Sequence, residues 1–486
     1  MSPVPSLTRR HLAKLGAAGI ASVAVASRLP AFAAAQDSIT IQWWDHYAPL
    51  EELLNGIFDA YHQANPNVTV ERTLYNLPEL GQSLQLAFNS GQAPDVHAIA
   101  SLNIPTARLV QDGWFTPIDD YVSDEFKARF PEGILLEGLH TFGGKLYSFP
   151  MFSFRSDSTA TWFNKQLVED AGLDPENPPA TWDEFRSAAK AVTDKGGGKT
   201  FGWIQAIGLP ERLGVQVSEL AQTAGAAGVI DWTTGEYAYH TDPFLQAIEF
   251  VMSMNADGSL MPGSTSLDAR NARANFAAGA AAFNFDGPWT VGVIDGSFPE
   301  FSDYLGVGQI PVPNASDAAY ISKGPNGGDF WVNSQSKHPE IGAAILEAFN
   351  TPEFYVGLAE RQDQPPLDLA AVQQATVHPA YAKALGLFGD IIRLAPVPEI
   401  KNPNVSEVNA RLTDIRPNFG EILQGLFSGD ISDAKTTLED YSSKLSADRE
   451  RAINDAVAAG FDVSADDWVF PNWVKSEDYT SEKYAG

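Results

Sequence analysis

The chain has 486 residues, too many for one compact domain, so two lobes or domains are expected. A formal net charge of -29 gives an acidic surface that repels nucleic acid and anionic membranes. Cysteine is absent, which excludes thiol catalysis, cysteine-ligated zinc, disulfides and a lipid-modified N-terminal cysteine.

Residues 1–35 carry the features of an export signal. Arg9 and Arg10 precede a mild apolar run, Gly16 to Ala26, that is too short to span a bilayer. Ala31 to Ala33 and Ala33 to Ala35 both fit a small-x-small cleavage site. The paired arginines resemble a twin-arginine signal, and an ordinary Sec signal is the alternative. We expect export of the mature protein by either route.

The mature chain begins with alternating strands and helices. Strands are expected at Ile39–Trp44, Val68–Glu71 and Pro94–Ile99, where β-rich or apolar residues cluster. Apolar residues at helical spacing predict helices around Leu53–Tyr61 and Leu80–Phe88. This alternation predicts an α/β fold with a largely parallel sheet.

Further helices are expected later in the chain. Thr181 and Glu184 fit a capping box, which predicts the start of a helix there. Helices are also expected at Phe419–Phe427 and Ser432–Leu445.

The segment from Ala274 to Trp289 is the most informative stretch. Gly279 fits the C-cap of a helix, and the apolar run after it fits a buried strand. Asp286 ends that strand, and Pro288 can start a helix. Trp289 therefore lies at a strand-to-helix junction, where open α/β sheets bind ligands. A buried tryptophan in a turn is the alternative.

Several segments together resemble the extracellular solute-binding proteins that serve sugar transporters of the ABC type. They occur in the family's order, and the resemblance extends from Ile39 to about Phe349. The matching segments are Ala274–Trp289, Ser90–Val96, Gly113–Ile118, Gly143–Pro150, Thr161–Lys165, Pro179–Phe185 and Ser336–Ile341. The resemblance implies a two-lobed periplasmic-binding-protein-like α/β fold of type II, with mixed, mostly parallel sheets and a hinge between the lobes.

The resemblance also implies a division of the chain. We expect the first part of lobe 1 at 36–155 and the first part of lobe 2 at 156–285. The chain would return to lobe 1 at 286–345. Residues 346–486 would form mainly lobe 2 helices plus an aromatic and acidic C-terminal extension that matches no family motif. The aromatic residues of this extension favour docking on a lobe.

The implied function is capture of a carbohydrate by hinge closure and its delivery to the permease subunits of an ABC transporter. We expect a monomer in the periplasm, without cofactor, metal or nucleic acid. A glycerol phosphate ester or another small solute is the alternative ligand, although the motif segments offer few cations for a phosphate. The sequence does not identify the sugar, its length or the permease.

Enzyme signatures are missing from the sequence. It contains no His-Glu-x-x-His, Gly-x-Ser-x-Gly or dinucleotide-binding glycine pattern. A secreted glycoside hydrolase remains the enzyme alternative, because two carboxylates across one bond would suffice. We expect a binding protein without a chemical step.

Candidate ligand contacts are aromatic, charged or glycine residues where strands end. Aromatic faces pack against sugar rings, and an unmet hydrogen bond in a closed cleft costs about 1–3 kcal/mol. Some candidates follow from their place after a strand, and others from the resemblance. The candidates are Trp44, Asp45, Asp286, Trp289, Gly327, Gly328, Trp331 and Arg361.

Overall fold

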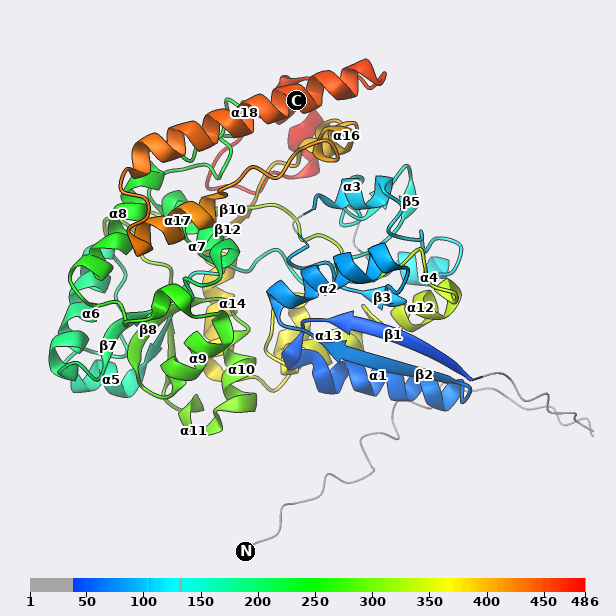
Figure 1. The fold of residues 1–486 in the computed structure, drawn as a ribbon. Coiled ribbons are helices and arrows are strands. Elements are labelled where there is room, and N and C mark those ends of the chain that lie inside the picture. The colour runs from blue at the N-terminus through cyan, green and yellow to red at the C-terminus, as the bar shows by residue number, and fades with distance from the viewer. Residues whose placement is uncertain (1–37, 103, 131–132, 486) are drawn as a thin grey trace, which may run out of the picture. The chain divides into compact units, whose positions relative to one another are not determined.

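The structure, a computed structural model, describes residues 38–102, 104–130 and 133–485. The expected signal peptide at 1–35 lies outside these residues. Buried apolar side chains of the described residues form two large cores and one small core. Figure 1 shows the elements that enclose them.

The first core surrounds a four-stranded sheet. Strand β1 (Ile39–Asp45) pairs in parallel with β2 (Val68–Leu74) and β3 (Val96–His97), and β11 (Trp331–Val332) joins β3 in antiparallel orientation. Helix α1 (Glu51–Ala64) buries Leu54 and Phe58, as its periodicity predicts. The other elements around this core are η2 (Ala48–Leu50), α2 (Leu77–Ser90), α3 (Thr106–Gln111), α4 (Asp124–Lys127), β4 (Thr141–Phe142), β5 (Lys145–Leu146), α12 (Pro339–Leu346), α13 (Pro352–Glu360) and η4 (Leu369–Gln373).

The second core surrounds another four-stranded sheet. Strand β8 (Ala281–Asp286) pairs in parallel with β7 (Phe201–Ile204), whereas β6 (Ala160–Asn164) runs antiparallel to both β8 and β9 (Leu305–Gly308). Of the two four-stranded sheets, the first therefore has the parallel majority expected from sequence, and the second is mostly antiparallel. Strand β6 enters from the other core, so no β-α-β crossover fixes its direction. The other elements are α5 (Lys165–Asp170), α6 (Trp182–Gly196), α7 (Pro210–Thr223), α8 (Asp242–Ala256), η3 (Ser264–Ser266), α9 (Ala269–Ala277), α10 (Thr290–Ser297), α11 (Pro299–Ser302), α14 (Pro379–Ile391) and α17 (Phe419–Ser428).

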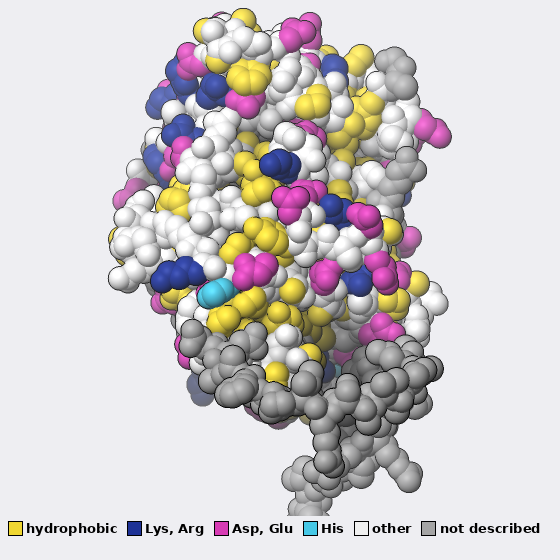
Figure 2. All heavy atoms as spheres, turned by 90° about the vertical axis from the view of Figure 1, so that its right-hand side faces the viewer, with side chains coloured by type: hydrophobic (Ala, Val, Ile, Leu, Met, Phe, Trp, Pro, Cys, Tyr) yellow, Lys and Arg dark blue, Asp and Glu magenta, His cyan; other side chains and the backbone are white. Residues whose placement is uncertain are grey.

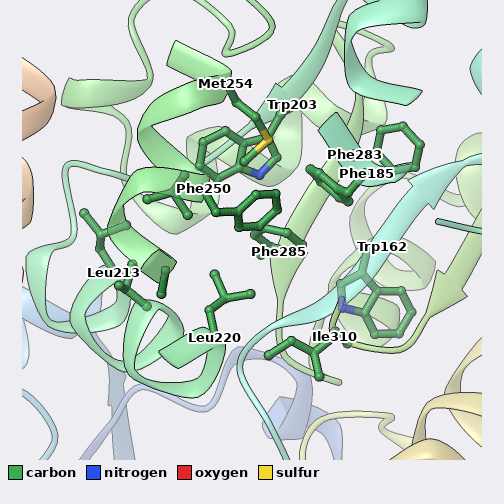
Figure 3. Close-up of a cluster of buried hydrophobic side chains, with 14 of the residues drawn as sticks. Trp162, Phe185, Trp203, Leu213, Leu220, Phe250, Met254, Phe283, Phe285 and Ile310 are labelled. Atoms are coloured by element: carbon green, nitrogen blue, oxygen red, sulfur yellow. The ribbon is translucent and has the colours of Figure 1, made fainter. Parts of the chain in front are cut away.

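Aromatic packing fills the second core. The rings of Phe185 and Phe285 stack with centroids 4.7 Å apart, and Trp203 meets Phe285 edge-on at 5.8 Å. Figure 3 shows these side chains close together between the sheet and its helices. The capping box predicted at Thr181 and Glu184 forms at the start of α6 and fixes where that helix begins.

Within the described residues, the chain passes between the two large cores three times. The passages are residues 153–159, 322–329 and 372–379, because the buried residues on either side of each belong to different cores. The return to the first lobe expected at 286 occurs later. Buried residues from Val291 to Ile321 still pack in the second core, and Phe330 is the first of the returning residues in the first core. Residues 346–371, expected in the second lobe, pack in the first core instead. Gly357 of α13 lies against Leu53 of α1.

The C-terminal region forms the small third core and contacts a passage between the lobes. Arg155, in the first passage, donates to Asp478 at 2.5 Å and to the Ile392 carbonyl at 2.5 Å. The Leu394 amide donates to Asp478 at 2.7 Å, and the Tyr479 amide donates back to the Leu394 carbonyl at 2.9 Å. The aromatic tail is thus docked through both side-chain and backbone hydrogen bonds. The elements of this region are β12 (Ile392–Leu394), α15 (Pro398–Lys401), α16 (Val405–Asn409), α18 (Ala434–Ala458), η5 (Ala465–Trp468) and η6 (Ser481–Ala485). Strand β12 pairs in parallel with β10 (Ile321–Lys323), which leads into the second passage.

The surface mixes charge types. On the face drawn in Figure 2, acidic and basic side chains are scattered among polar and apolar ones. Among the helices of the described residues, none combines the length and the apolar character needed to cross a membrane.

Candidate ligand-binding site

An open cavity of about 1710 Å³ is lined by residues from both lobes. The first lobe contributes the loop after β1 and the segment after α13, which include Tyr47 and Asp363. The second lobe contributes the start of α7, helix α9 and the turn before α10, which include Arg212, Arg273 and Trp289. Its volume exceeds the roughly 300–1,000 Å³ of most small-molecule pockets. We therefore describe it as a cleft between the lobes.

Asp286, at the end of β8, organises the wall contributed by the second lobe. Its carboxylate accepts hydrogen bonds from Arg273 Nε at 2.6 Å and Nη2 at 3.3 Å, and from Arg212 Nη1 at 2.9 Å. The Gly287 amide at 2.9 Å and Trp289 Nε1 at 2.7 Å complete five donors. Burial favours a higher pKa for Asp286, but the charges of Arg273 and Arg212 hold that pKa below its ordinary value.

Four of the five donors bond Oδ1, and Arg273 Nε bonds Oδ2, so both carboxylate oxygens are engaged within the lobe. Asp286 is 4% exposed and does not line the cavity. Its placement argues against the ligand contact expected from sequence. It instead fixes the two arginines and Trp289, which do line the cavity.

Trp289 lines the cavity, and its ring is already in contact with neighbours. The guanidinium carbon of Arg212 lies 4.4 Å from the indole centroid. A Cβ at Gly287 would lie 2.3 Å from the indole, so only glycine permits this packing. A sugar ring can therefore stack on Trp289 only where Arg212 and Gly287 leave the indole uncovered.

Asp45 is engaged inside the first lobe. Arg72 Nε and Nη2 each donate to its carboxylate at 2.7 Å, and the Tyr47 amide donates at 2.9 Å. Asp45 is fully buried and lines neither this cavity nor its smaller neighbour, which argues against the ligand contact expected from sequence. It instead positions the loop that presents Tyr47.

The smaller cavity, of about 310 Å³, adjoins the first and shares His46, Tyr47 and Gln364 with it. Gly327 and Gly328, both predicted from sequence, line this smaller cavity. A Cβ at Gly328 would lie 2.1 Å from Ser148 Oγ, whereas a Cβ at Gly327 would meet open space. Gly328 is thus required for packing, and Gly327 leaves room beside the backbone.

Tyr47 lines both cavities, and it is hydrogen-bonded to Asp329, which lines the smaller one. The Tyr47 hydroxyl donates to Asp329 Oδ1 at 2.7 Å, and the Met151 amide donates to Oδ2 at 2.7 Å. Burial raises the pKa of Asp329 to about 7. Burial also lowers the pKa of the adjacent His46 to about 3, with a contribution from Arg212, so this imidazole stays neutral.

The remaining predicted residues are divided between the cavity and the core. Arg361 lines the large cavity and forms an ion pair with Glu52. Trp331 is fully buried against Phe115, with centroids 4.4 Å apart, which argues against ligand contact. Trp44 packs on Tyr75 at 5.0 Å and lines neither cavity.

Sequence reasoning missed five residues of this site. Arg212, Arg273 and Asp363 lie far apart in the sequence, and no short motif links them. Tyr47 directly follows Asp45-His46, and Asp329 directly follows Gly327-Gly328. Both could have been predicted, because they stand beside candidates chosen for their place at the end of a strand or in a turn. Within the described part of the chain, His, Asp and Glu side chains form no group of three or more that could hold a metal ion.

The sequence profile for bacterial extracellular solute-binding proteins matches residues 47–354. The chain belongs to this family. This solute-binding protein is 27% identical over 270 residues to a putative binding protein of Brucella abortus strain 2308. The match covers 54% of the chain and spans only 60% of that relative's length. It is also 22% identical to an sn-glycerol-3-phosphate-binding periplasmic protein of Rhizobium meliloti strain 1021, covering 83% of the chain and 92% of the relative.

Solved structures of similar fold include two sugar complexes. One is an ABC transporter solute-binding protein from Thermotoga lettingae bound to alpha-D-tagatose, with a TM-score of 0.66 and 18% identity, covering 85% of this chain and 100% of that one. The other is the Thermus thermophilus maltotriose-binding protein, with a TM-score of 0.60 and 23% identity over 85% of this chain and 100% of that one. These likenesses confirm the predicted two-lobed α/β fold of this solute-binding protein.

Proposed function

We propose that this solute-binding protein captures a carbohydrate in the large cavity and delivers it to the permease subunits of an ABC transporter. The supporting observation is the composition of the cavity wall, in which Trp289, Tyr47, two fixed arginines and Asp363 face one space. An aromatic face packs the C–H side of a sugar ring, while charged groups hydrogen-bond its hydroxyls. The sugars bound by both structural neighbours agree with this ligand class.

We infer that the lobes close over the ligand by rotation about the three passages. Periplasmic binding proteins close around their ligands by hinge motion between two lobes, and the two-lobed fold supports the same motion for this protein. The role assigned to the protein is binding and release, with the ligand unchanged. We further propose export through the N-terminal signal, a location in the periplasm and action as a monomer.

A glycerol phosphate ester is the second candidate ligand. The matching motifs contain few cations, but the fold brings Arg212, Arg270, Arg273 and Arg361 around the large cavity. Arginine pairs well with phosphate because its planar fork of donors matches the oxygens. The Rhizobium meliloti relative is named for binding this type of ligand.

A titration decides between the candidates. Purified protein without its signal would be titrated with mono- and oligosaccharides and with sn-glycerol 3-phosphate, following tryptophan fluorescence and heat. We expect saturable sugar binding, recovery of intact sugar and weaker binding by Trp289→Ala. Cleaved sugar would identify a hydrolase, and a response to sn-glycerol 3-phosphate alone would establish the second candidate.

A further inference from the structure

Asp363 differs from the other buried carboxylates around the cavity. It is 5% exposed and lines the cavity, yet no hydrogen bond or ion pair reaches its carboxyl group from the described residues. Asp286 has five donors, and Asp329 has two. Neither of its oxygens is among the fully buried side-chain atoms that lack a partner, so the carboxyl group opens onto the cavity, where a ligand can reach it.

The neighbouring residue holds Asp363 in place. Gln362 adopts φ 54°, in the left-handed region that non-glycine residues rarely occupy. Its side chain donates to Asp295 at 2.6 Å and accepts from the His378 amide at 2.5 Å. The Gly292 amide donates to its carbonyl at 3.2 Å. These contacts fix a strained backbone immediately before Asp363, and such strain is concentrated at functional sites.

Arg212 offers unused donor groups on the cavity that this carboxyl group lines. Arg212 uses only Nη1 toward Asp286, and its Nε and Nη2 have no partner among the described residues. Burial raises the pKa of Asp363 to about 7, the charge of Asp329 raises it further, and the charges of Arg273 and Arg212 oppose the rise. The phenols of Tyr47 and Tyr381, whose pKa values burial raises, already donate to Asp329 and to the Gln364 carbonyl, so they leave Arg212 as the donor for a ligand.

We propose that Asp363 determines the specificity of this site by accepting hydrogen bonds from hydroxyl groups of a neutral polyol, while Arg212 donates to a neighbouring ligand oxygen. This inference rests on the proposed carbohydrate function and names the residue that separates it from phosphate binding. A carboxylate repels a phosphate ester at the same position but accepts from sugar hydroxyls.

The test compares Asp363→Asn with Asp390→Asn, which makes the same change at an exposed carboxyl outside the cavity. Asp363→Asn is expected to weaken sugar binding roughly tenfold or more, because a hydrogen bond to a charged group is about twice as strong as one between neutral groups. Asp390→Asn should bind as the wild type does. Equal sugar affinity in wild type and Asp363→Asn would overturn the inference and leave the carbohydrate function standing. A wild type that binds only sn-glycerol 3-phosphate would overturn both.

The pH dependence of sugar affinity is a second test, and it can be measured on the wild type even if Asp363→Asn does not fold. Sugar affinity of the wild type should rise as pH increases through about 7, because the ionised carboxyl is the better acceptor. Asp329 titrates in the same range, so the variant is needed to separate the two carboxyl groups. If Asp363→Asn folds, its sugar affinity should show little of the rise with pH. Affinity that stays constant between about pH 6 and 8 would contradict the proposal.

Discussion

Asp286 shows how a residue that does not line the cavity fixes the side chains that do. One carboxylate compensates the Arg212 and Arg273 guanidinium groups and anchors the Trp289 indole. Removing it would leave two buried cations without their counter-charge. We expect Asp286→Asn to lower the free energy of unfolding by about 3–5 kcal/mol, measured by denaturant unfolding. An equally stable variant would show that the arginines find other partners.

The residue scale also marks the limit of sequence reasoning. The motif around Trp289 predicts a cavity position because it places this residue directly after a short apolar strand. Arg212 and Arg273 stand at the start of α7 and within α9, and only folding brings them to the same carboxylate. Gly327 and Gly328, shortly before Trp331, favour the interpretation of Trp331 as a site residue. Strand β11 has only two residues, so the alternation of side chains along it does not show whether Trp331 points to the core or to the cavity.

Helix α10 is the element that fixes the cavity segment around Asp363. A Cβ at Gly292 would lie 2.3 Å from the Arg361 carbonyl oxygen, so the helix approaches this segment as closely as glycine allows. Gly292→Ala should destabilise the protein by about 1–3 kcal/mol and weaken ligand binding, as followed by thermal unfolding and titration. Gly296→Ala is the matched control for stability in the same helix, and because Gly296 lines the large cavity, ligand binding is compared between wild type and Gly292→Ala alone. A Cβ at Gly296 meets nothing within 4 Å, and the higher helix propensity of alanine should leave stability equal or slightly greater.

Predictability at the element scale depends on how strong the periodicity is. Helix α1 and strands β1 and β2 follow from clear apolar repeats and are present. Helix α18 extends to Ala458, well beyond the predicted end at Leu445. Its second half buries Ala452 and Ala456 in the small core, and small residues produce too weak an apolar repeat to be recognised.

At the scale of the whole molecule, Asp329 links stability to pH. Its pKa is about 7 in the fold and 3.8 ordinarily, so the folded state holds the proton more tightly. Its contribution to stability is complete below pH 3.8 and is lost as pH rises through about 7. The buried His46, His97 and His140, whose pKa values are lowered, act in the opposite direction below their ordinary value of 6.5.

Comparison with Asp329→Asn cancels the contribution of the histidines, which both proteins share. The charge of Asp329 raises the pKa of Asp363, so the comparison reports Asp329 together with this effect on Asp363. The difference between the two unfolding free energies should change with pH between about 4 and 7, with the wild-type advantage shrinking as pH rises. Chemical unfolding at several pH values measures this difference. Parallel curves across the range would mean that Asp329 is ionised in the fold.

The anchoring of the C-terminal segment beside Arg155 has a practical consequence for optical reporting. Glu482 is exposed, and the segment before it is tied to a passage between the lobes. Because the chain has no cysteine, Glu482→Cys would create a single attachment point for a maleimide dye. A dye at that point would sit outside the cavity, where it cannot compete with the ligand, and would still be coupled to any rotation of the lobes. The protein could thus serve as a reagentless sensor for its own ligand.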